Sequence, residues 1–224
     1  MSAPSPTGRH GPRRIVVLGP QGAGKGTQGV RLAGRVGVPA VSTGDIFRAN
    51  VSGGTELGVT ARTYMDAGEL VPDEVTVAMV ADRLAEPDAA HGFLLDGFPR
   101  NRDQAEALAG ILDRLGTGLD VVLRLTLPDE LIVRRLSGRR VDARTGKVWH
   151  VETDPPPPAD VAAGVVVQRD DDRPGPIARR LEIYRQQTEP LVQFYADAGL
   201  LATVDGDGSV DQVADRVASA TGSV

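Results

Sequence analysis

A glycine-rich segment near the start of the chain, residues 19–27, constrains the fold more than any other feature. It reads Gly-Pro-Gln-Gly-Ala-Gly-Lys-Gly-Thr, follows the apolar run 15–18 and leads into a segment of helical pattern. Glycines let a backbone bend around an anion and point N–H groups at it, and Lys25 adds a cation beside the positive end of the helix. This order is typical of a loop that binds the phosphates of a nucleoside triphosphate. A plain glycine-rich turn is the alternative.

The loop departs from the usual pattern where magnesium commonly binds. The pattern G-x-x-x-x-G-K-[ST] is met through Lys25, but Gly26 takes the place of the hydroxyl residue and Thr27 comes one residue later. Asp96 ends a buried-looking strand, where an ionised carboxylate needs a cation or hydrogen-bond donors nearby. We therefore predict that Asp96 holds Mg²⁺ mainly through the water shell of the ion. An Asp that caps the following turn is the alternative.

Short apolar runs rich in β-branched residues are the candidate strands, at residues 15–18, 38–41, 93–95, 121–127 and 201–204. Helical patterns separate them, which favours an α/β fold: a five-stranded parallel sheet between helices, the three-layer arrangement of P-loop NTPases. Ligands bind at the carboxyl ends of such strands. The polar motifs 42–45 and 96–100 directly follow two of the runs. We therefore expect one site at this edge of the sheet.

Two segments interrupt the alternation of strands and helices. One is a helical stretch at 45–67, and the other is an irregular stretch at 138–172 that contains the prolines 155–158. The second has arginine-rich borders, so we expect a small lid lobe that closes over an anionic ligand. Residues 1–13 are rich in Pro, Ser, Gly and basic side chains but lack the apolar segment of a signal peptide, and we expect a flexible tail.

Composition excludes several classes of protein. The 224 residues include 25 basic and 30 acidic side chains, a formal net charge of -5, which does not support a general attraction to nucleic acid or to an anionic membrane. The chain has no cysteine, so disulfides and thiolate metal sites are excluded. No hydrophobic run approaches membrane-spanning length. We expect a cytoplasmic monomer without structural zinc.

Arginines stand at the expected strand ends and lid borders, where phosphoryl transfer would need positive charge. Arg135 and Arg139 are four residues apart and are predicted to share one face of a helix that begins near Pro128. Arg48, Arg100, Arg169 and Arg180 complete the set. A guanidinium group suits bidentate contact with phosphate oxygens. Surface arginines paired with nearby acids are the alternative.

Several ordered motifs resemble those of an adenylate kinase of the nucleoside monophosphate kinase family. They are GPQGAGKGTQ at 19–28, VSTGDIFR at 41–48, GELV at 68–71, DGFPR at 96–100, GRR at 138–140, RDDD at 169–172 and RLEIY at 180–184. The resemblance covers about residues 13–220. It implies reversible transfer of the terminal phosphoryl group of ATP to AMP, giving two ADP, with magnesium required. It also implies a core at 14–41, 72–137 and 173–224, an AMP-binding region at 42–71 and a lid at 138–172.

The resemblance implies a role for each matched residue. The catalytic set is Lys25, Arg100, Arg135, Arg139, Arg169 and Arg180. The ATP-binding set is Gly22, Ala23, Gly24, Lys25, Gly26, Thr27, Arg135, Arg139, Val148, Trp149 and Gly208. The AMP-binding set is Thr43, Arg48, Glu69, Leu70, Val71, Gly97, Phe98, Pro99, Arg100, Gln104, Arg169 and Arg180.

The acceptor base can be argued from two positions. Related pyrimidine kinases tend to carry Ala and Asn where this chain has Thr43 and Gln104. A Gln side chain can pair with a donor and an acceptor on an adenine edge, which favours AMP over CMP or UMP. Asn101 is shared with the pyrimidine enzymes, so a UMP/CMP kinase is the alternative. A catalytically silent nucleotide sensor is a remote second, because such a protein could lose Lys25 and the arginines without losing its fold.

The lid departs from the family pattern. Many bacterial members fix it with zinc on four cysteines, and others use a hydrogen-bonded set that includes His and Ser. Here Asp142 and Thr145 occupy two of the corresponding places and Asp160 is a candidate for a third. We predict a metal-free lid held by polar contacts and by the prolines 155–158. Trp149 matches a position that covers the ATP base and ribose, but it could equally form the small core of the lobe.

Overall fold

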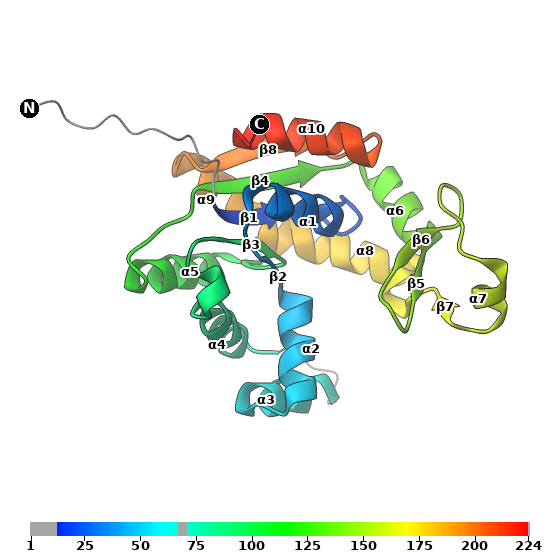
Figure 1. Cartoon of the computed structure of the whole chain (residues 1–224), viewed down its shortest axis with the longest axis horizontal. Coiled ribbons are helices and arrows are strands. Elements are labelled where there is room, and N and C mark those ends of the chain that lie inside the picture. The colour runs from blue at the N-terminus through cyan, green and yellow to red at the C-terminus, as the bar shows by residue number, and fades with distance from the viewer. Residues whose placement is uncertain (1–12, 67–70, 224) are drawn as a thin grey trace, which may run out of the picture.

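A five-stranded parallel sheet forms the centre of the molecule (Figure 1). The computed structural model describes residues 13–66 and 71–223, so the expected tail, apart from Arg13, lies outside the described residues. The strands are β1 (Arg14–Leu18), β2 (Ala40–Ser42), β3 (Phe93–Asp96), β4 (Val121–Thr126) and β8 (Leu201–Asp205), in the order β2-β3-β1-β4-β8. Each predicted run contributes a strand, and the predicted α/β fold is confirmed.

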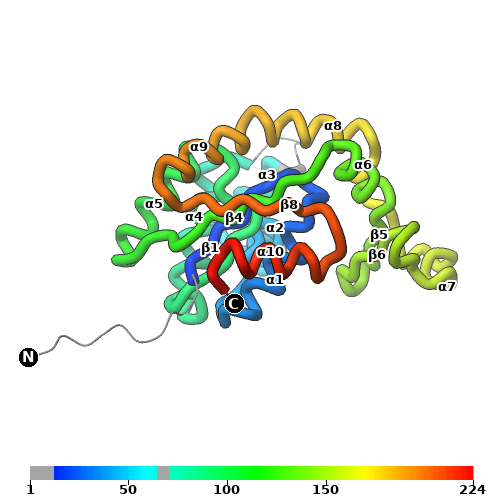
Figure 2. The backbone as a smooth tube through the Cα atoms, turned by 90° about the horizontal axis from the view of Figure 1, so that it is seen from above, coloured from blue at the N-terminus to red at the C-terminus, as the bar shows by residue number. Residues whose placement is uncertain are grey.

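Both faces of this sheet are buried, which explains why its strands are continuous apolar runs. Along β1, Ile15 and Val17 belong to one hydrophobic core, whereas Val16 and Leu18 belong to the other. The first core includes residues of α1 (Lys25–Val36) and α10 (Val210–Thr221), and the second includes residues of α4 (Asp73–Leu84), α5 (Arg102–Arg114) and α9 (Pro190–Asp197). The view along the sheet shows these layers (Figure 2). The result is the three-layer arrangement.

Two helices run from the sheet toward the lobe at 138–172 (Figure 1). They are α6 (Asp129–Gly138) and α8 (Pro174–Ile183). A π-helical turn, η3 (Tyr184–Thr188), joins α8 to α9, and two short 3₁₀ turns, η1 (Pro87–Ala89) and η2 (Asp170–Asp172), precede β3 and α8. The helices α6 and α8 contact each other, so they form the base from which the lobe extends.

The helical stretch predicted at 45–67 consists of two helices, α2 (Thr43–Gly53) and α3 (Glu56–Asp66), which project from the sheet (Figure 1). Gly54 ends α2 with φ +64°, a left-handed conformation that favours glycine. The hydroxyl group of Thr55 then donates to Oδ1 of Asn50 at 2.6 Å and accepts from the N–H of Gly58 at 3.0 Å. These contacts turn the chain between the helices.

The lobe at 138–172, called the lid lobe below, contains a small antiparallel sheet that the sequence did not predict. It is built from β5 (Arg139–Asp142), β6 (Val148–His150) and β7 (Val166–Val167) in the order β6-β5-β7, with α7 (Pro158–Ala162) beside it. Strands of two to four residues are too short to show an alternating pattern. Only the last proline of 155–158 is helical, and it begins α7, where a missing N–H has no cost.

Candidate active site

The glycine-rich loop connects β1 to α1 and caps the helix with a glycine. Gly24 is the residue before α1 and has φ +95°, a left-handed conformation that a side chain would strain. Nζ of Lys25 donates a hydrogen bond to the carbonyl oxygen of Pro20 at 3.0 Å, across the loop. A Cβ at Gly19 would lie 2.5 Å from the carbonyl oxygen of Leu125. The loop is therefore held against β4 and ends at a helix N-terminus, which is a favourable place for phosphate.

A second loop, which follows β8, rests on the first. The N–H of Gly206 donates to the carbonyl oxygen of Thr126 at 2.8 Å. A Cβ at Gly206 would lie 2.9 Å from the carbonyl oxygen of Ala23, so only glycine allows this approach. The predicted ATP-binding residue Gly208 lies in this second loop, two residues further on. Sequence reasoning missed Gly206, because nothing in its neighbourhood marks a contact with a distant backbone.

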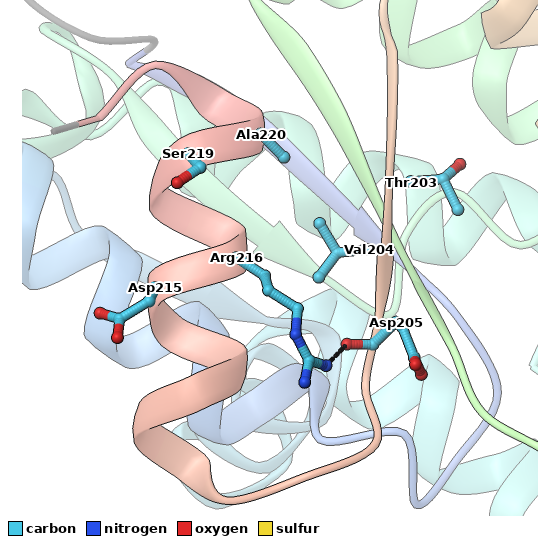
Figure 3. Close-up of a pocket in the computed structure, with 7 residues that line it drawn as sticks. All are labelled: Thr203, Val204, Asp205, Asp215, Arg216, Ser219 and Ala220. Carbon is cyan, nitrogen blue, oxygen red and sulfur yellow. Dashed lines mark hydrogen bonds between the residues drawn. The ribbon is translucent and has the colours of Figure 1, made fainter.

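Arg216 of α10 fixes the same loop from the other side (Figure 3). Its Nη1 donates to the carbonyl oxygens of Asp205 at 2.8 Å and Asp207 at 2.6 Å. An open groove between β8 and α10 is lined by Thr203, Val204, Asp205, Asp215, Arg216, Ser219 and Ala220. None of the predicted site residues is in that lining, so this groove is not the candidate site.

Positive charge is concentrated around Lys25. Burial, together with the nearby charges of Arg100, Arg180 and Arg139, lowers the pKa of Lys25 from 10.5 to about 8, whereas Asp96 acts in the opposite direction. The structure therefore brings together four of the six predicted catalytic residues, from four different segments. A bound polyanion would relieve their mutual repulsion.

Asp96 supplies the opposite charge at the carboxyl end of β3. Burial raises the pKa of this carboxyl group, and Asp45 raises it further, while Lys25 and Arg100 lower it. A Cβ at Gly26 would lie 3.7 Å from Oδ2 of Asp96, so the carboxylate lies close to the phosphate loop. A partly buried carboxylate beside a phosphate loop fits Mg²⁺ that keeps most of its water ligands. Within 13–66 and 71–223, no three or more His, Cys, Asp or Glu side chains are arranged so that they could hold a metal ion together, so the remaining ligands would be water and phosphate oxygens.

Two of the predicted arginines bind acids from η2 at the far border of the lid lobe. Arg139 makes a bidentate contact with Asp172, with N···O distances of 2.8 and 2.6 Å, and the side chain of Asp172 is fully buried. Arg180 donates from Nη1 to Oδ2 of Asp171 at 2.7 Å. The alternative that these arginines pair with nearby acids is thus true in part. The pair with Asp172 is bidentate and buried, however, so it is stronger than an ion pair on the solvent-exposed surface. The first pair connects the two ends of the lobe, and the second connects its far end to α8.

The predicted placement of Arg135 and Arg139 on one helix face is wrong. The helix α6 ends at Gly138, and Arg139 begins β5 in an extended conformation, where it pairs with His150. The change of direction needs a glycine, since a Cβ at Gly138 would lie 2.3 Å from Nε2 of His150. Arg135 remains on α6, and its Nη2 lies 3.9 Å from Oδ1 of Asp207 in the loop that holds Gly208.

Residues predicted to bind AMP converge on the carbonyl oxygen of Gly97. It accepts from Nε of Arg100 at 2.9 Å and from Oγ1 of Thr43 at 3.3 Å. The N–H of Arg100 in turn donates to Oε1 of Gln104 at 2.8 Å. Both proposed base readers, Thr43 and Gln104, are buried. One short network therefore links these two residues to Arg100.

Other predicted AMP-binding residues lie outside this network. Arg48 pairs with Asp45 on α2, and its side chain is 71% exposed. Arg169 is exposed and has no ion pair with the residues that the structure describes. Phe98 and Pro99 follow β3 and are buried, and Phe98 belongs to the hydrophobic core that contains Val16 and Leu18. Val71 packs partly against the same core, while Glu69 and Leu70 lie outside the described residues.

The position of Trp149 in the lid lobe is compatible with both of the roles predicted for it. Trp149 is half-buried on β6, and Nζ of Lys147 lies 3.6 Å from the centre of its ring. Its Nε1 is buried and finds no hydrogen-bond partner among the described residues. Val148 is 54% exposed. The ring contributes to the packing of the lobe, and its Nε1–H is a donor that no acceptor among the described residues satisfies.

In the lid lobe, Arg144 binds the acids that stand where the resemblance places the stabilising ligands of other family lids. Oδ1 of Asp142 accepts from the N–H groups of Arg144 at 2.8 Å and Thr145 at 3.2 Å, and Nη2 of Arg144 donates to Oδ2 of Asp142 at 2.9 Å. The same Nη2 lies 3.8 Å from Asp160. The Arg144 hydrogen bonds lower the pKa of Asp142 to about 2. The sequence indicates the two acids and the threonine, but it gives no signal for the role of Arg144.

A further residue that sequence reasoning missed holds the backbone of Arg100. Oγ1 of Thr188, in η3, donates to the carbonyl oxygen of Arg100 at 2.8 Å. A single threonine within a helical pattern gives no signal of such a role. The π-helical turn that carries it is a known feature of functional segments and is not visible in hydrophobic periodicity.

The fold and the site define the class: an α/β protein with a phosphate loop and a cluster of cations suited to phosphoryl groups. Comparisons with known proteins give the family. The sequence pattern of the family described as Adenylate kinase matches residues 17–200. The chain therefore belongs to the adenylate kinase family.

Curated relatives cover nearly the whole chain. A protein of Salinispora tropica named Adenylate kinase is 55% identical over 210 residues, which are 92% of this chain and 97% of the relative. A protein of the same name from Streptomyces coelicolor is 52% identical over 92% of this chain and 97% of its own length. Another from Methanothrix thermoacetophila is 48% identical over 91% of this chain and 95% of its own length. The likeness thus extends over the phosphate loop, the helical insertion and the lid lobe.

Proposed function

We propose that this chain is an enzyme that transfers the terminal phosphoryl group of ATP to AMP, reversibly, to give two ADP. The observation that carries the proposal is the cluster of Lys25 with Arg100, Arg139 and Arg180, opposed by Asp96 at the carboxyl end of β3. Membership of the adenylate kinase family supports it. Phosphoryl transfer between two anionic nucleotides needs such charge more than it needs a nucleophile or a base.

The proposed reaction is an in-line displacement. An oxygen of the AMP phosphate forms a bond to the γ-phosphorus of ATP, and the bond from that phosphorus to the β–γ bridging oxygen breaks, leaving ADP on both sides. Lys25 would neutralise charge on the transferring group and on the leaving oxygen, because it lies at the start of α1 beside the phosphate loop. Arg100, Arg139 and Arg180 would hold the remaining phosphate oxygens in line. A magnesium ion near Asp96 would supply charge neutralisation at the donor phosphates.

We infer where the two nucleotides bind from the loops that follow β1 and β8 and from the hydrogen bonds around the carbonyl oxygen of Gly97. ATP would lie with its phosphates over residues 22–27 and its base near Gly208, with Arg135 and the lid residues Val148 and Trp149 covering it. AMP would lie with its phosphate toward Arg100, Arg48 and Arg169. We further infer that residues 42–71 act as the AMP-binding region and that the lid lobe closes over ATP, which would exclude water from the reaction.

The acceptor base is proposed to be adenine. Thr43 is joined to Arg100 through the Gly97 carbonyl group, and Gln104 accepts directly from the N–H of Arg100, so a base that contacts both would sit beside the phosphate position. Asn101, the feature shared with pyrimidine kinases, uses its amide to cap α5 and to bind Asp73. Its presence therefore has a local reason and does not favour a pyrimidine acceptor.

The cellular setting is also a proposal. No helix within the described ranges has the length and apolar character needed to cross a bilayer. We infer a monomer in the cytoplasm, since its substrates ATP, AMP and ADP are found there and since a cysteine-free chain needs no oxidising compartment. Neither nucleic acid nor a membrane is an expected partner.

The test is a panel of acceptors. ATP with Mg²⁺ is incubated with AMP, CMP, UMP or GMP, alongside a control without acceptor that measures leakage to water, and product diphosphates are separated. We expect ADP formation with AMP to exceed the rate with each pyrimidine nucleotide by orders of magnitude. A preference for CMP or UMP would overturn the proposal, as would ATP binding without transfer to any acceptor.

A further inference from the structure

The side-chain amide of Gln104 is held in one orientation by partners of opposite polarity. Its Oε1 accepts from the N–H of Arg100 at 2.8 Å, and its Nε2 donates to Oδ1 of Asp73 at 2.6 Å. A backbone N–H can only donate, and an ionised carboxylate can only accept. Rotation of the amide by 180° would place donor against donor and acceptor against acceptor. The assignment of oxygen and nitrogen is therefore determined by the network itself.

Asp73 also orients the neighbouring amide. Nδ2 of Asn101 donates to Oδ2 of Asp73 at 2.6 Å, and Oδ1 of Asn101 accepts from the N–H of Gln104 at 2.9 Å. The two oxygens of one carboxylate thus bind two amides that lie three residues apart at the start of α5. Asp73 itself is the first residue of α4, directly after the predicted AMP-binding region. It connects that region to the start of α5.

The network leaves part of the hydrogen-bonding capacity of the Gln104 amide unused. A Gln amide carries two donor and two acceptor sites. One donor is used by Asp73 and one acceptor site by Arg100, so one N–H and one lone pair remain. An adenine edge offers the complement, an acceptor nitrogen beside the amino group at position 6. Hypoxanthine has a carbonyl oxygen at position 6 and an N–H beside it, so it would need the flipped amide.

We propose that Asp73 is a specificity-determining positioning residue, which fixes the Gln104 amide in the polarity that accepts a 6-amino purine and rejects a 6-oxo purine. This inference rests on the proposed function, with Gln104 as a reader of the acceptor base. Sequence reasoning missed Asp73, because an acidic residue in the first turn of a helix is expected from the helix dipole alone.

The test compares AMP with IMP as acceptor for the wild-type protein, Asp73→Asn and Glu74→Gln. The asparagine keeps the shape of Asp73 but offers one acceptor and one donor group, so Asp73 no longer fixes the Gln104 amide and only the N–H of Arg100 opposes its flip. We expect the ratio of kcat/KM for AMP to that for IMP to fall roughly tenfold, with the change mainly in KM and with kcat for AMP within about threefold of wild type. Glu74→Gln removes the same charge from the next, exposed residue and is expected to keep the wild-type ratio.

The outcomes separate the inference from the function on which it rests. A folded Asp73→Asn protein that keeps the wild-type AMP/IMP ratio would overturn the role of Asp73, whereas a wild-type protein that does not phosphorylate AMP would overturn the proposed function. Asp73→Ser, which also suits a helix start, is measured in parallel in case Asp73→Asn does not fold. A merely structural role would lower activity on both acceptors equally and leave the ratio unchanged, which also counts against the proposal.

Discussion

Lys25 and Asp96 are the opposite charges at the centre of the site, and the structure desolvates both. Burial lowers the pKa of the lysine to about 8 and raises the pKa of the carboxyl group, while each charge partly compensates the other. Charged groups that a protein buries without a full set of partners usually serve a ligand. The buried charge of Lys25 therefore lowers the stability of the nucleotide-free protein, and it becomes favourable only when phosphate binds.

This cost gives a prediction for Lys25→Met. We expect phosphoryl transfer to fall by several orders of magnitude, since the variant loses charge that acts on the transition state. At the same time the free energy of unfolding of the nucleotide-free protein should rise by about 2 kcal/mol at pH 7, after allowance for solvent and for the lost contact with Pro20. Urea unfolding at equilibrium measures the second effect.

The gain in stability should depend on pH in a defined direction. The folded pKa of Lys25, about 8, lies below the ordinary value of 10.5, so between these values the unfolded chain binds more protons than the folded one. The cost in the wild-type protein is complete below pH 8 and disappears as the pH rises toward 10.5. The advantage of Lys25→Met should therefore shrink between pH 7 and pH 10. An equal advantage at both pH values would show that the lysine is not desolvated.

Arg100 and Arg102 form a matched pair for mutation. Arg100 belongs to the charge cluster around Lys25, whereas Arg102, two residues on, is 72% exposed and pairs with Glu106. Arg100→Ala should lower kcat by roughly two to three orders of magnitude, since removal of one group that stabilises transition-state charge typically costs this much. Arg102→Ala should leave kcat within about twofold. Steady-state rates with saturating ATP and AMP decide, and comparable losses in the two variants would contradict the assignment.

Asp96→Asn tests the magnesium site. We expect the Mg²⁺ concentration for half-maximal transfer to rise about tenfold, because an amide attracts the hydrated ion less than a carboxylate does. Removal of the metal with EDTA should abolish transfer in wild type and variant alike. Asp113→Asn, an exposed change on α5, serves as the control. A magnesium titration curve of Asp96→Asn that superimposes on the wild-type curve would refute the role.

Arg144→Ala tests how the lid lobe is held together. The variant loses the cation that binds Asp142 and lies 3.8 Å from Asp160, so we expect faster hydrogen exchange across 139–167 with little change in the sheet. Trp149, the only tryptophan of the chain, lies on the neighbouring strand β6, and its emission should shift to longer wavelength. Arg179→Ala, which breaks an exposed pair with Glu182, is the control.

The same lobe gives a pH prediction and a metal prediction. The pKa of Asp142 is depressed to about 2, so its contribution to stability is present above its ordinary value of 3.8 and is lost as the pH falls from there toward 2. The emission of Trp149 should accordingly stay constant down to about pH 4.

Elemental analysis of untagged protein is expected to show no stoichiometric zinc. Unchanged exchange in Arg144→Ala, or one zinc per chain, would contradict a lobe held by Arg144.

The sheet was predictable because its chemistry is local. Buried parallel strands must be apolar on both faces, so runs such as 15–18 and 121–127 show the sheet without knowledge of their partners. The phosphate loop was predictable for a similar reason, since the glycines and Lys25 that form it are contiguous. By contrast, the sequence predicts a helix that includes Arg139, whereas the helix ends one residue earlier, because the strand of Arg139 depends on pairing with His150 eleven residues away.

The parts of the site that the sequence did not predict depend on contacts between distant segments. Asp73 and Gln104 are 31 residues apart, and Thr188 and Arg100 are 88 apart. Each of these residues has an ordinary local explanation, as a helix-start acid or a helical threonine. Only the folded chain shows that they hold the side chain of Gln104, the proposed base reader, and the backbone of Arg100.

The most direct test of the account follows the phosphoryl group itself. ATP labelled at the γ-phosphate is mixed with unlabelled AMP, Mg²⁺ and the protein, and the products are separated over time. We expect the label to appear in ADP as its β-phosphate, with little in inorganic phosphate, and no labelled ADP when AMP is omitted. Label found mainly in inorganic phosphate, whether or not AMP is present, would contradict transfer between nucleotides and identify the site as a hydrolase.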